Sequence, residues 1–129
     1  MLLACINSSS ATLAAIVDTR AFTVCVLDTD SRAISEIFAA PGHEQFAGVG
    51  WHRAGHTRMP VLDAALAHAE CTVRDISEAG DHTVVFGTVV GGSADHTRDP
   101  LGYWRTNYLR LHNAIELHGR ADTTWIGEL

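Results

Sequence analysis

Residues 61–90, VLDAALAHAECTVRDISEAGDHTVVFGTVV, decide the fold, because they hold two long strand-forming segments separated by one turn. β-branched residues favour one strand over residues 61–77 and another over residues 82–90, and Glu-Ala-Gly-Asp at 78–81 supplies the turn. Strands joined by so short a turn pair antiparallel. The apolar run at 84–86 is typical of a strand that is buried on both faces.

Upstream of this hairpin, strand and helix patterns alternate. Residues 2–7 and 22–27 are short apolar segments that predict strands, and each is followed by a helical pattern, over 8–20 and 31–40. Residues 41–60 break into Gly, His and Pro, which predicts a long ordered loop that could cover a site. This order predicts an α+β, mainly β fold, and the lack of regular helical crossovers favours an antiparallel barrel over a doubly wound sheet.

Length and composition limit the function classes. The chain has 129 residues, 47% hydrophobic and 19% charged, which predicts one domain over 1–129. The net charge is −6 and the basic residues are scattered, so we expect no nucleic-acid surface. All nine basic residues are Arg, which excludes lysine Schiff-base chemistry and a P-loop lysine. No segment is long enough to span a membrane, and no Gly-x-Gly-x-x-Gly follows a strand.

The number and spacing of the cysteines bear on the cellular compartment of the protein. Cys5, Cys25 and Cys71 are an odd number without Cys-x-x-Cys spacing, which favours reduced thiols in a cytoplasmic protein over a disulfide framework. The opening MLLAC is like a lipoprotein cleavage box, yet no basic residue or apolar run of signal length precedes it. We therefore expect no export.

The first strand and helix predict an anion site. Asn7 ends the strand, and Ser8, Ser9 and Ser10 lead into the helix, so hydroxyls, an amide and free backbone N–H groups gather at the positive end of the helix dipole. Such a cluster suits a phosphate. An ordinary serine N-cap explains the same residues.

Several motifs in order resemble the small flavin reductases with a split-barrel flavin-binding fold, many of which are reductase components of two-component monooxygenases. The matching stretches are ACINSSSATLAAI at 4–16, FTVCVLD at 22–28, SRAISEIFA at 31–39, EQFAGVGW at 44–51, PVLDAALAHAECTV at 60–73, GDHTVVFGTV at 80–89 and PLGYWRTNYLRL at 100–111. The resemblance implies hydride transfer from NADH or NADPH to FMN or FAD, with release of reduced flavin to a partner monooxygenase.

The resemblance also assigns roles to residues. It implies that Gly80, Asp81 and His82 line the pocket where the nicotinamide nucleotide docks over the flavin, with His82 as the catalytic positioning group; a turn histidine satisfied by its neighbours is the alternative. Hydride transfer needs mainly orientation and electrostatics from the protein. The implied cofactor contacts are Cys5, Ile6, Asn7, Ser8, Ser9, Ser10, Ala11, Thr12, Ala39, Gln45, Phe46, Asp81, His82, Thr83 and Val84.

Two departures from the family pattern bear on assembly and affinity. The family's opening strands, one of which lies along the isoalloxazine ring, have no counterpart before Met1, so we expect an N-terminally shortened barrel with an uncovered sheet edge. A second copy would cover that edge, which predicts a homodimer. Gln45 stands where the family commonly has a basic residue, and Gly102 replaces a bulkier apolar residue, so flavin binding should be weaker.

Two other functions stay open. One is a non-catalytic split-barrel protein with a structural or regulatory role and weak flavin binding; the other binds a different planar cofactor such as haem, with His82 or His43 as an axial ligand. His52 and His56 have a metal-ligand spacing, with His43 and Glu44 nearby, but they lie in a loop-like stretch, and we expect no metal site. Acidic pairs at 28 and 30 and at 95 and 99 lack the glycine and glutamate of a calcium loop, and no Gly-x-Ser-x-Gly marks a hydrolase.

Overall fold

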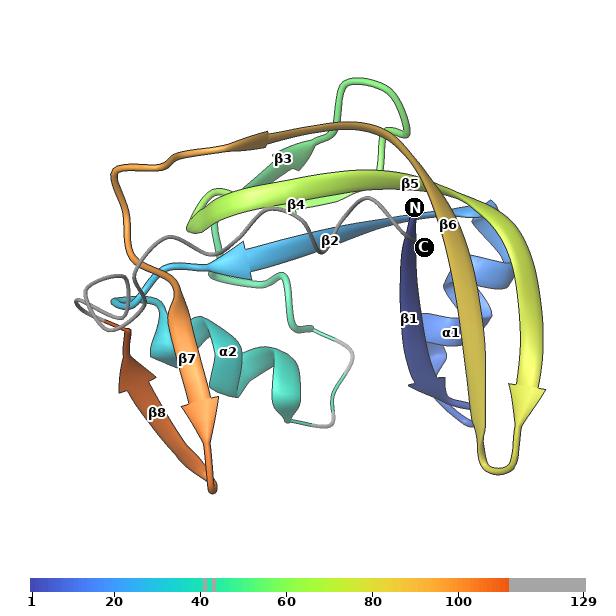
Figure 1. Ribbon diagram of the computed structural model, residues 1–129, viewed down its shortest axis with the longest axis horizontal. Coiled ribbons are helices and arrows are strands. Elements are labelled where there is room, and N and C mark those ends of the chain that lie inside the picture. The colour runs from blue at the N-terminus through green and yellow to red at the C-terminus, as the bar shows by residue number, and fades with distance from the viewer. Residues whose placement is uncertain (41, 43, 112–129) are drawn as a thin grey trace, which may run out of the picture.

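A curled, four-stranded antiparallel sheet forms the body of the protein in the computed structural model, which describes residues 1–40, 42 and 44–111 (Figure 1). Its strand order is β1-β6-β5-β2, where β1 is Leu2–Asn7, β2 is Ala21–Leu27, β5 is Ala65–Ala79 and β6 is His82–Ala94. The prediction of a mainly β, antiparallel fold with short helices is confirmed.

The β5–β6 hairpin is the longest paired element. Its register runs from Ala67 opposite Ala94 to Ala79 opposite His82, with one bulge at Val90 of β6 and one at Arg74 of β5, and Gly80 closes it at φ +64°. Only glycine adopts that angle without steric cost. The hairpin was predicted, but β5 begins at Ala65 rather than Val61, because Val61 belongs to a separate short strand. β6 runs on to Ala94, beyond the predicted end at residue 90.

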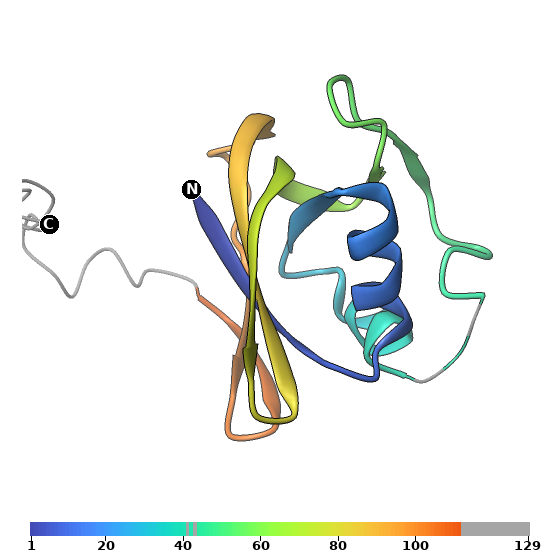
Figure 2. The same ribbon diagram turned by 90° about the vertical axis from the view of Figure 1, so that its right-hand side faces the viewer.

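Helix α1, Ala11–Thr19, crosses the inner face of the sheet (Figure 2). Ser10 is its N-cap and Arg20, at φ 57°, ends it. Leu13 and Ile16 of the helix bury against Phe22, Cys71 and Val85, which come from β2, β5 and β6. The core therefore joins α1 to three of the four strands.

Two small hairpins and a second helix complete the described chain. Helix α2 spans Arg32–Ala39, the first hairpin pairs β3 (Trp51–Arg53) with β4 (Pro60–Leu62), and the second pairs β7 (Leu101–Trp104) with β8 (Asn107–Arg110). The long ordered loop predicted over 41–60 contains β3 and the start of β4, which were not predicted because three-residue strands are too short to leave an alternating pattern. No helix in the described ranges is long and apolar enough to cross a membrane.

An ion pair fastens the end of β2 to the segment after β6. Asp28 accepts hydrogen bonds from Arg98 and from Ser31, and Arg98 also donates to the carbonyls of Ala64 and Ala65. The Arg98 guanidinium, with help from the Ser31 hydroxyl, lowers the pKa of Asp28 below its usual range. Arg98 therefore links three segments that are distant in sequence: the end of β2, the start of β5 and the segment after β6.

The close approach of Phe22 to Gly87 gives a stability test. A Cβ on Gly87 would lie 2.5 Å from Phe22 Cζ and 2.9 Å from Cys71 Cβ. Gly87→Ala should therefore lower the free energy of unfolding by about 1–3 kcal/mol, measured in urea, because it overfills a packed core. Gly55→Ala is the control, since nothing lies within 4 Å of its Cβ position. Equal stability of the two variants would contradict the packing described.

Candidate functional site

The turn between β1 and α1 is ordered by its own side chains. Asn7 Oδ1 accepts from the backbone N–H of Ser9 at 2.9 Å and from its hydroxyl at 2.6 Å. Ser10 Oγ accepts from the N–H of Thr12 at 3.1 Å, so Ser10 is a true helix N-cap. The sequence left a serine cap and an anion site as alternatives; the cap exists, and the other N–H groups of the first helical turn stay available for an anion.

This turn lies directly beside the Gly-Asp-His tip of the β5–β6 hairpin. The N–H of Ser8 donates to the carbonyl of Asp81 at 3.0 Å, and the Ser8 and Thr83 hydroxyls are 2.9 Å apart. In the β1–β6 ladder Asn7 is the cross-strand partner of His82. The two halves of the predicted site, 75 residues apart in sequence, are therefore neighbours.

The imidazole of His82 is oriented by the residue before it. His82 Nδ1 lies 2.8 Å from Asp81 Oδ1, while 43% of the His82 side chain and 89% of the Asp81 side chain are exposed. A carboxylate at this place favours the proton on Nδ1, which leaves Nε2 as an acceptor directed away from Asp81. The pair is too exposed to add much stability, but it presents an oriented polar group to solvent.

Strand alternation divides the predicted contacts between the two faces of the sheet. Cys5 and Asn7 pair with Val84 and His82, and all four side chains lie on the outer face. Ile6 and Thr83, which pair in the same ladder, face inward toward α1. The turn at Ser8–Ser10 is where the chain passes from one face to the other.

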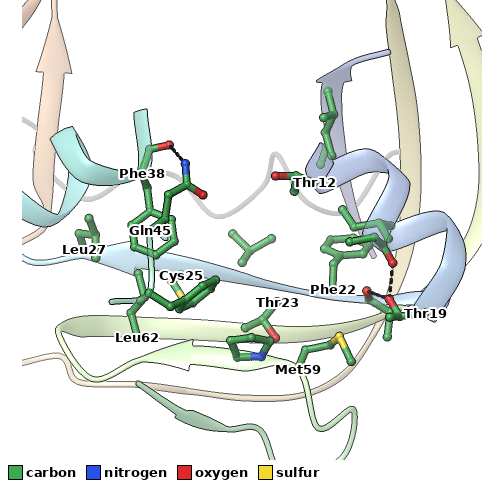
Figure 3. A pocket seen from close by; sticks show the side chains of 18 of the residues that line it. Thr12, Thr19, Phe22, Thr23, Cys25, Leu27, Phe38, Gln45, Met59 and Leu62 are labelled. Atoms are coloured by element: carbon green, nitrogen blue, oxygen red, sulfur yellow. Dashed lines mark hydrogen bonds between the residues drawn. The ribbon is translucent and has the colours of Figure 1, made fainter. Parts of the chain in front are cut away.

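A cavity of about 670 Å³ lies on the inner side, along β2 and between α1, α2 and the β3–β4 hairpin (Figure 3). Of the predicted cofactor contacts, Ile6, Thr12, Gln45 and Phe46 line it. Most of its other lining is apolar: Ile16, Phe22, Val24, Leu27, Phe38, Met59 and Leu62. Its volume is within the range of small-molecule sites.

A few polar groups lie within or beside this apolar lining. The Thr12 hydroxyl lines the cavity, and Thr23 Oγ1, also in the lining, is buried without a hydrogen-bond partner among the described residues. The Gln45 amide donates to the carbonyls of Phe38 and Ala40 at 3.3 and 3.1 Å, so it closes the C-terminal end of α2. Ala39 lies between these carbonyls and is exposed, outside the cavity lining.

Three aromatic rings pack together at one side of the cavity: Phe38 and Phe46 line it, and Trp51 packs against Phe46 from outside the lining. Phe46 packs edge-on against Phe38 at 5.1 Å and against Trp51 at 5.6 Å between ring centroids, and 40% of Phe46 is exposed. Such edge-to-face pairs hold the rings in fixed orientations. The sequence indicated Phe46 but missed Phe38, Thr23 and Met59, because α2 periodicity and a loop-like stretch gave no sign that they face one hollow.

A second hollow, of about 530 Å³, surrounds the start of α1. It is lined by Ser8, Ser9, Ser10, Ala11, Leu13, Ala14, Val17 and Asp18. No basic side chain is among these residues, so an anion there would rest on backbone N–H groups and hydroxyls alone. Such a site is weaker than one with a guanidinium.

Residues considered as metal ligands do not gather. His52 Nδ1 bonds Asp63 at 2.7 Å, and His56 lies in the turn that follows β3. His43, considered for metal or haem, lies outside the described residues. Within the described part of the chain, no three His, Cys, Asp or Glu side chains are grouped to hold a metal ion.

Comparison with known proteins gives consistent relatives. The family model described as "Flavin reductase like domain" matches residues 1–112. The chain is 42% identical over 112 residues to a flavin reductase (NADH) of Kitasatospora aureofaciens, covering 85% of this chain and 59% of that protein. It is 38% identical over 108 residues to the reductase component of a 4-nitrophenol 4-monooxygenase/4-nitrocatechol 2-monooxygenase of Rhodococcus opacus, covering 84% and 57%.

A solved structure supports the same relationship. The homologue of nitrilotriacetate monooxygenase component B from Mycobacterium thermoresistibile superposes with a TM-score of 0.82 at 33% identity, covering 92% of this chain and 66% of that one. The chain thus spans a little under three-fifths of the length of the two curated relatives, at 59% and 57%.

The contribution of the Ser10 cap to stability can be measured directly. Ser10→Ala removes the cap on Thr12 and should lower the free energy of unfolding by about 1 kcal/mol. Ser10→Asp keeps an accepting oxygen at the cap and should unfold at nearly the wild-type urea concentration. If Ser10→Ala were as stable as the wild type, the cap would contribute nothing.

Proposed function

The chain belongs to the flavin reductase-like domain family, and on that premise we propose that it catalyses NADH- or NADPH-dependent reduction of free FMN or FAD. We further propose that the reduced flavin passes to a partner monooxygenase. The observation that carries the proposal is the contact between the turn at Asn7–Ser10 and the tip at Asp81–Thr83, inside a family match that covers residues 1–112.

The residues present are suitable for a flavin. The start of α1 offers backbone N–H groups and the Ser8 hydroxyl to a phosphate, while the Ser9 hydroxyl donates to Asn7. Thr12, in the first turn of the same helix, lines the cavity, where apolar side chains and a half-exposed Phe46 suit a planar aromatic ring. Thr23 Oγ1 is a buried hydroxyl that needs a partner, which a polar ring atom would supply. Bound flavin would supply the hydride acceptor of the reaction.

His82 acts on the second substrate. Because Asp81 holds its ring, His82 can present Nε2 as a fixed acceptor beside the Asn7–Ser10 turn. A fixed hydrogen-bond partner limits the orientations of a docked nicotinamide nucleotide, which is the main contribution a protein makes to direct hydride transfer. In this role His82 positions substrate and transfers no proton.

Assembly and location complete the proposal. β1 is at the edge of its sheet, and Leu3 and Cys5 direct alternate backbone groups away from β6. The segment carries no charge or proline, the usual protection of an edge strand, and 62% of Leu3 is exposed. We propose that a second copy covers this edge in a homodimer, and that the protein acts in the cytoplasm.

Activity is the first test. Purified protein supplied with NADH should oxidise it only when FMN or FAD is added, followed by absorbance at 340 nm. Repeating the assay with NADPH ranks the two nucleotides. A folded sample that neither binds flavin nor oxidises either nucleotide would favour the non-catalytic alternative.

Substitutions should separate the two halves of the site. Ser10→Asp places a negative charge where a phosphate would bind, so flavin affinity should fall about tenfold or more although the fold is retained. Thr12→Val should weaken flavin binding about two- to tenfold, through one lost hydrogen bond. His82→Ala should leave flavin affinity nearly unchanged and raise KM for the nicotinamide nucleotide about ten- to a hundredfold. Loss of flavin binding in His82→Ala would refute this division of roles.

The dimer has its own test. Light scattering at micromolar concentration should give twice the mass of one chain, and Leu3→Lys should shift the protein toward monomer, because lysine on an edge strand opposes strand pairing. Val17→Lys, which places the same charge on an exposed position of α1, is the control. A wild-type monomer would count against the assembly.

A further inference from the structure

Glu70 is a buried carboxylate that the proposed chemistry does not use. It lies in β5, only 3% exposed, opposite Thr23 of β2 on one side and Gly91 of β6 on the other. A buried charge is costly unless it is well hydrogen-bonded. The partners of Glu70 therefore indicate what it holds.

Among the residues that the structure describes, the side-chain hydrogen bonds of Glu70 all go to the turn that joins β3 to β4. Oε2 of Glu70 accepts from the N–H of His56 at 2.9 Å, the N–H of Thr57 at 2.8 Å and the hydroxyl of Thr57 at 3.2 Å. The Thr57 N–H is the main cause that lowers the pKa of Glu70 below its usual range, against the opposing effect of burial. These hydrogen bonds favour the ionised carboxylate.

The turn leads directly into the cavity wall. The N–H of Met59 donates to Thr57 Oγ1 at 3.3 Å, and Ala54 closes the turn by donating to the carbonyl of Met59 at 2.9 Å. Met59 lines the cavity. A continuous chain of hydrogen bonds therefore runs from Glu70 through Thr57 to a wall residue.

The same turn stores strain and depends on a close fit. Arg58 adopts φ +63°, a left-handed conformation that costs a non-glycine residue about 1 kcal/mol or more. The His56 ring packs on Gly91 so closely that a Cβ there would lie 2.5 Å from it. A turn that is strained in this way relaxes when its anchor is removed.

We infer that Glu70 is a positioning residue, which fixes Met59 in the cavity wall by holding the turn at 54–59 onto the sheet. Its effect on catalysis rests on the proposed function, but its effect on the wall does not.

The three cysteines provide a readout that distinguishes local opening from unfolding. Cys25 lines the cavity and is half-buried, and burial raises its pKa, against a hydrogen bond from the backbone of Leu62 in β4. Cys71 is completely buried in the core, and Cys5 is exposed on β1. A thiol reagent followed by peptide mass spectrometry reports each of them separately.

Glu70→Ala should raise the rate of Cys25 modification at pH 7 by at least about tenfold, since it removes hydrogen bonds to a charged group. Cys5 should react as in the wild type and Cys71 should stay protected. Glu70→Gln, which keeps one accepting oxygen, should restore most of the protection. Thr57→Val removes the hydroxyl that donates to Glu70 and accepts from Met59 but keeps the backbone N–H bonds to Glu70, so it should give an intermediate rate. Glu78→Ala is the control, an exposed glutamate on the same strand.

Two results would overturn the inference. The first is unchanged Cys25 reactivity in Glu70→Ala. The second is a rise in Cys71 reactivity that parallels the rise in Cys25 reactivity in Glu70→Ala, Glu70→Gln and Thr57→Val. That result would show that Glu70 stabilises the whole fold rather than the position of the turn. If the wild type reduces flavin, Glu70→Ala should also raise KM for flavin more than it changes kcat. Failure of flavin binding in the wild type would refute the proposed function and leave the labelling result to decide on Glu70.

Discussion

The pairing of β5 with β6 is the constraint on which the rest of the structure depends. β1 pairs only with β6 and β2 only with β5, so the two outer strands have no direct contact in the ladder. Their separation is set by the curl of the central hairpin, which one bulge in β5 and one in β6 increase. The cavity exists because β1 and β2 diverge while α1 and α2 lie across the opening (Figure 1).

The same ladder explains how much of the fold and the site the sequence could predict. Local signals were sufficient for Leu2–Asn7, for a serine cap among residues 8–10 and for the long hairpin, because each depends on neighbouring residues; that the cap is Ser10 follows from the structure. The β3–β4 hairpin was missed because its strands are short and held by a distant carboxylate, Glu70. No spacing rule indicates that a glutamate in a strand binds a turn 13 residues earlier.

Site prediction had a similar limit. The serine turn and the Gly-Asp-His tip were both evident in sequence, but that Asn7 lies opposite His82 follows only from the register of β1 on β6. Register also divides the predicted contacts, with His82 and Val84 on one face and Ile6 on the other. A reductase must bring two substrates together, and two faces that meet at one turn offer separate approaches for them.

The position of β1 in the chain has a consequence for biosynthesis. Leu2 pairs with Gly87, so β1 cannot pair until the ribosome has made β6, roughly 80 residues later. At typical bacterial and eukaryotic rates of synthesis this is a delay of about 4 to 16 seconds. Throughout that time LLACI is an uncharged, apolar segment without its partner, which is the kind of segment that chaperones bind. The slower the chain is translated, the longer this segment stays without the strand that pairs with it.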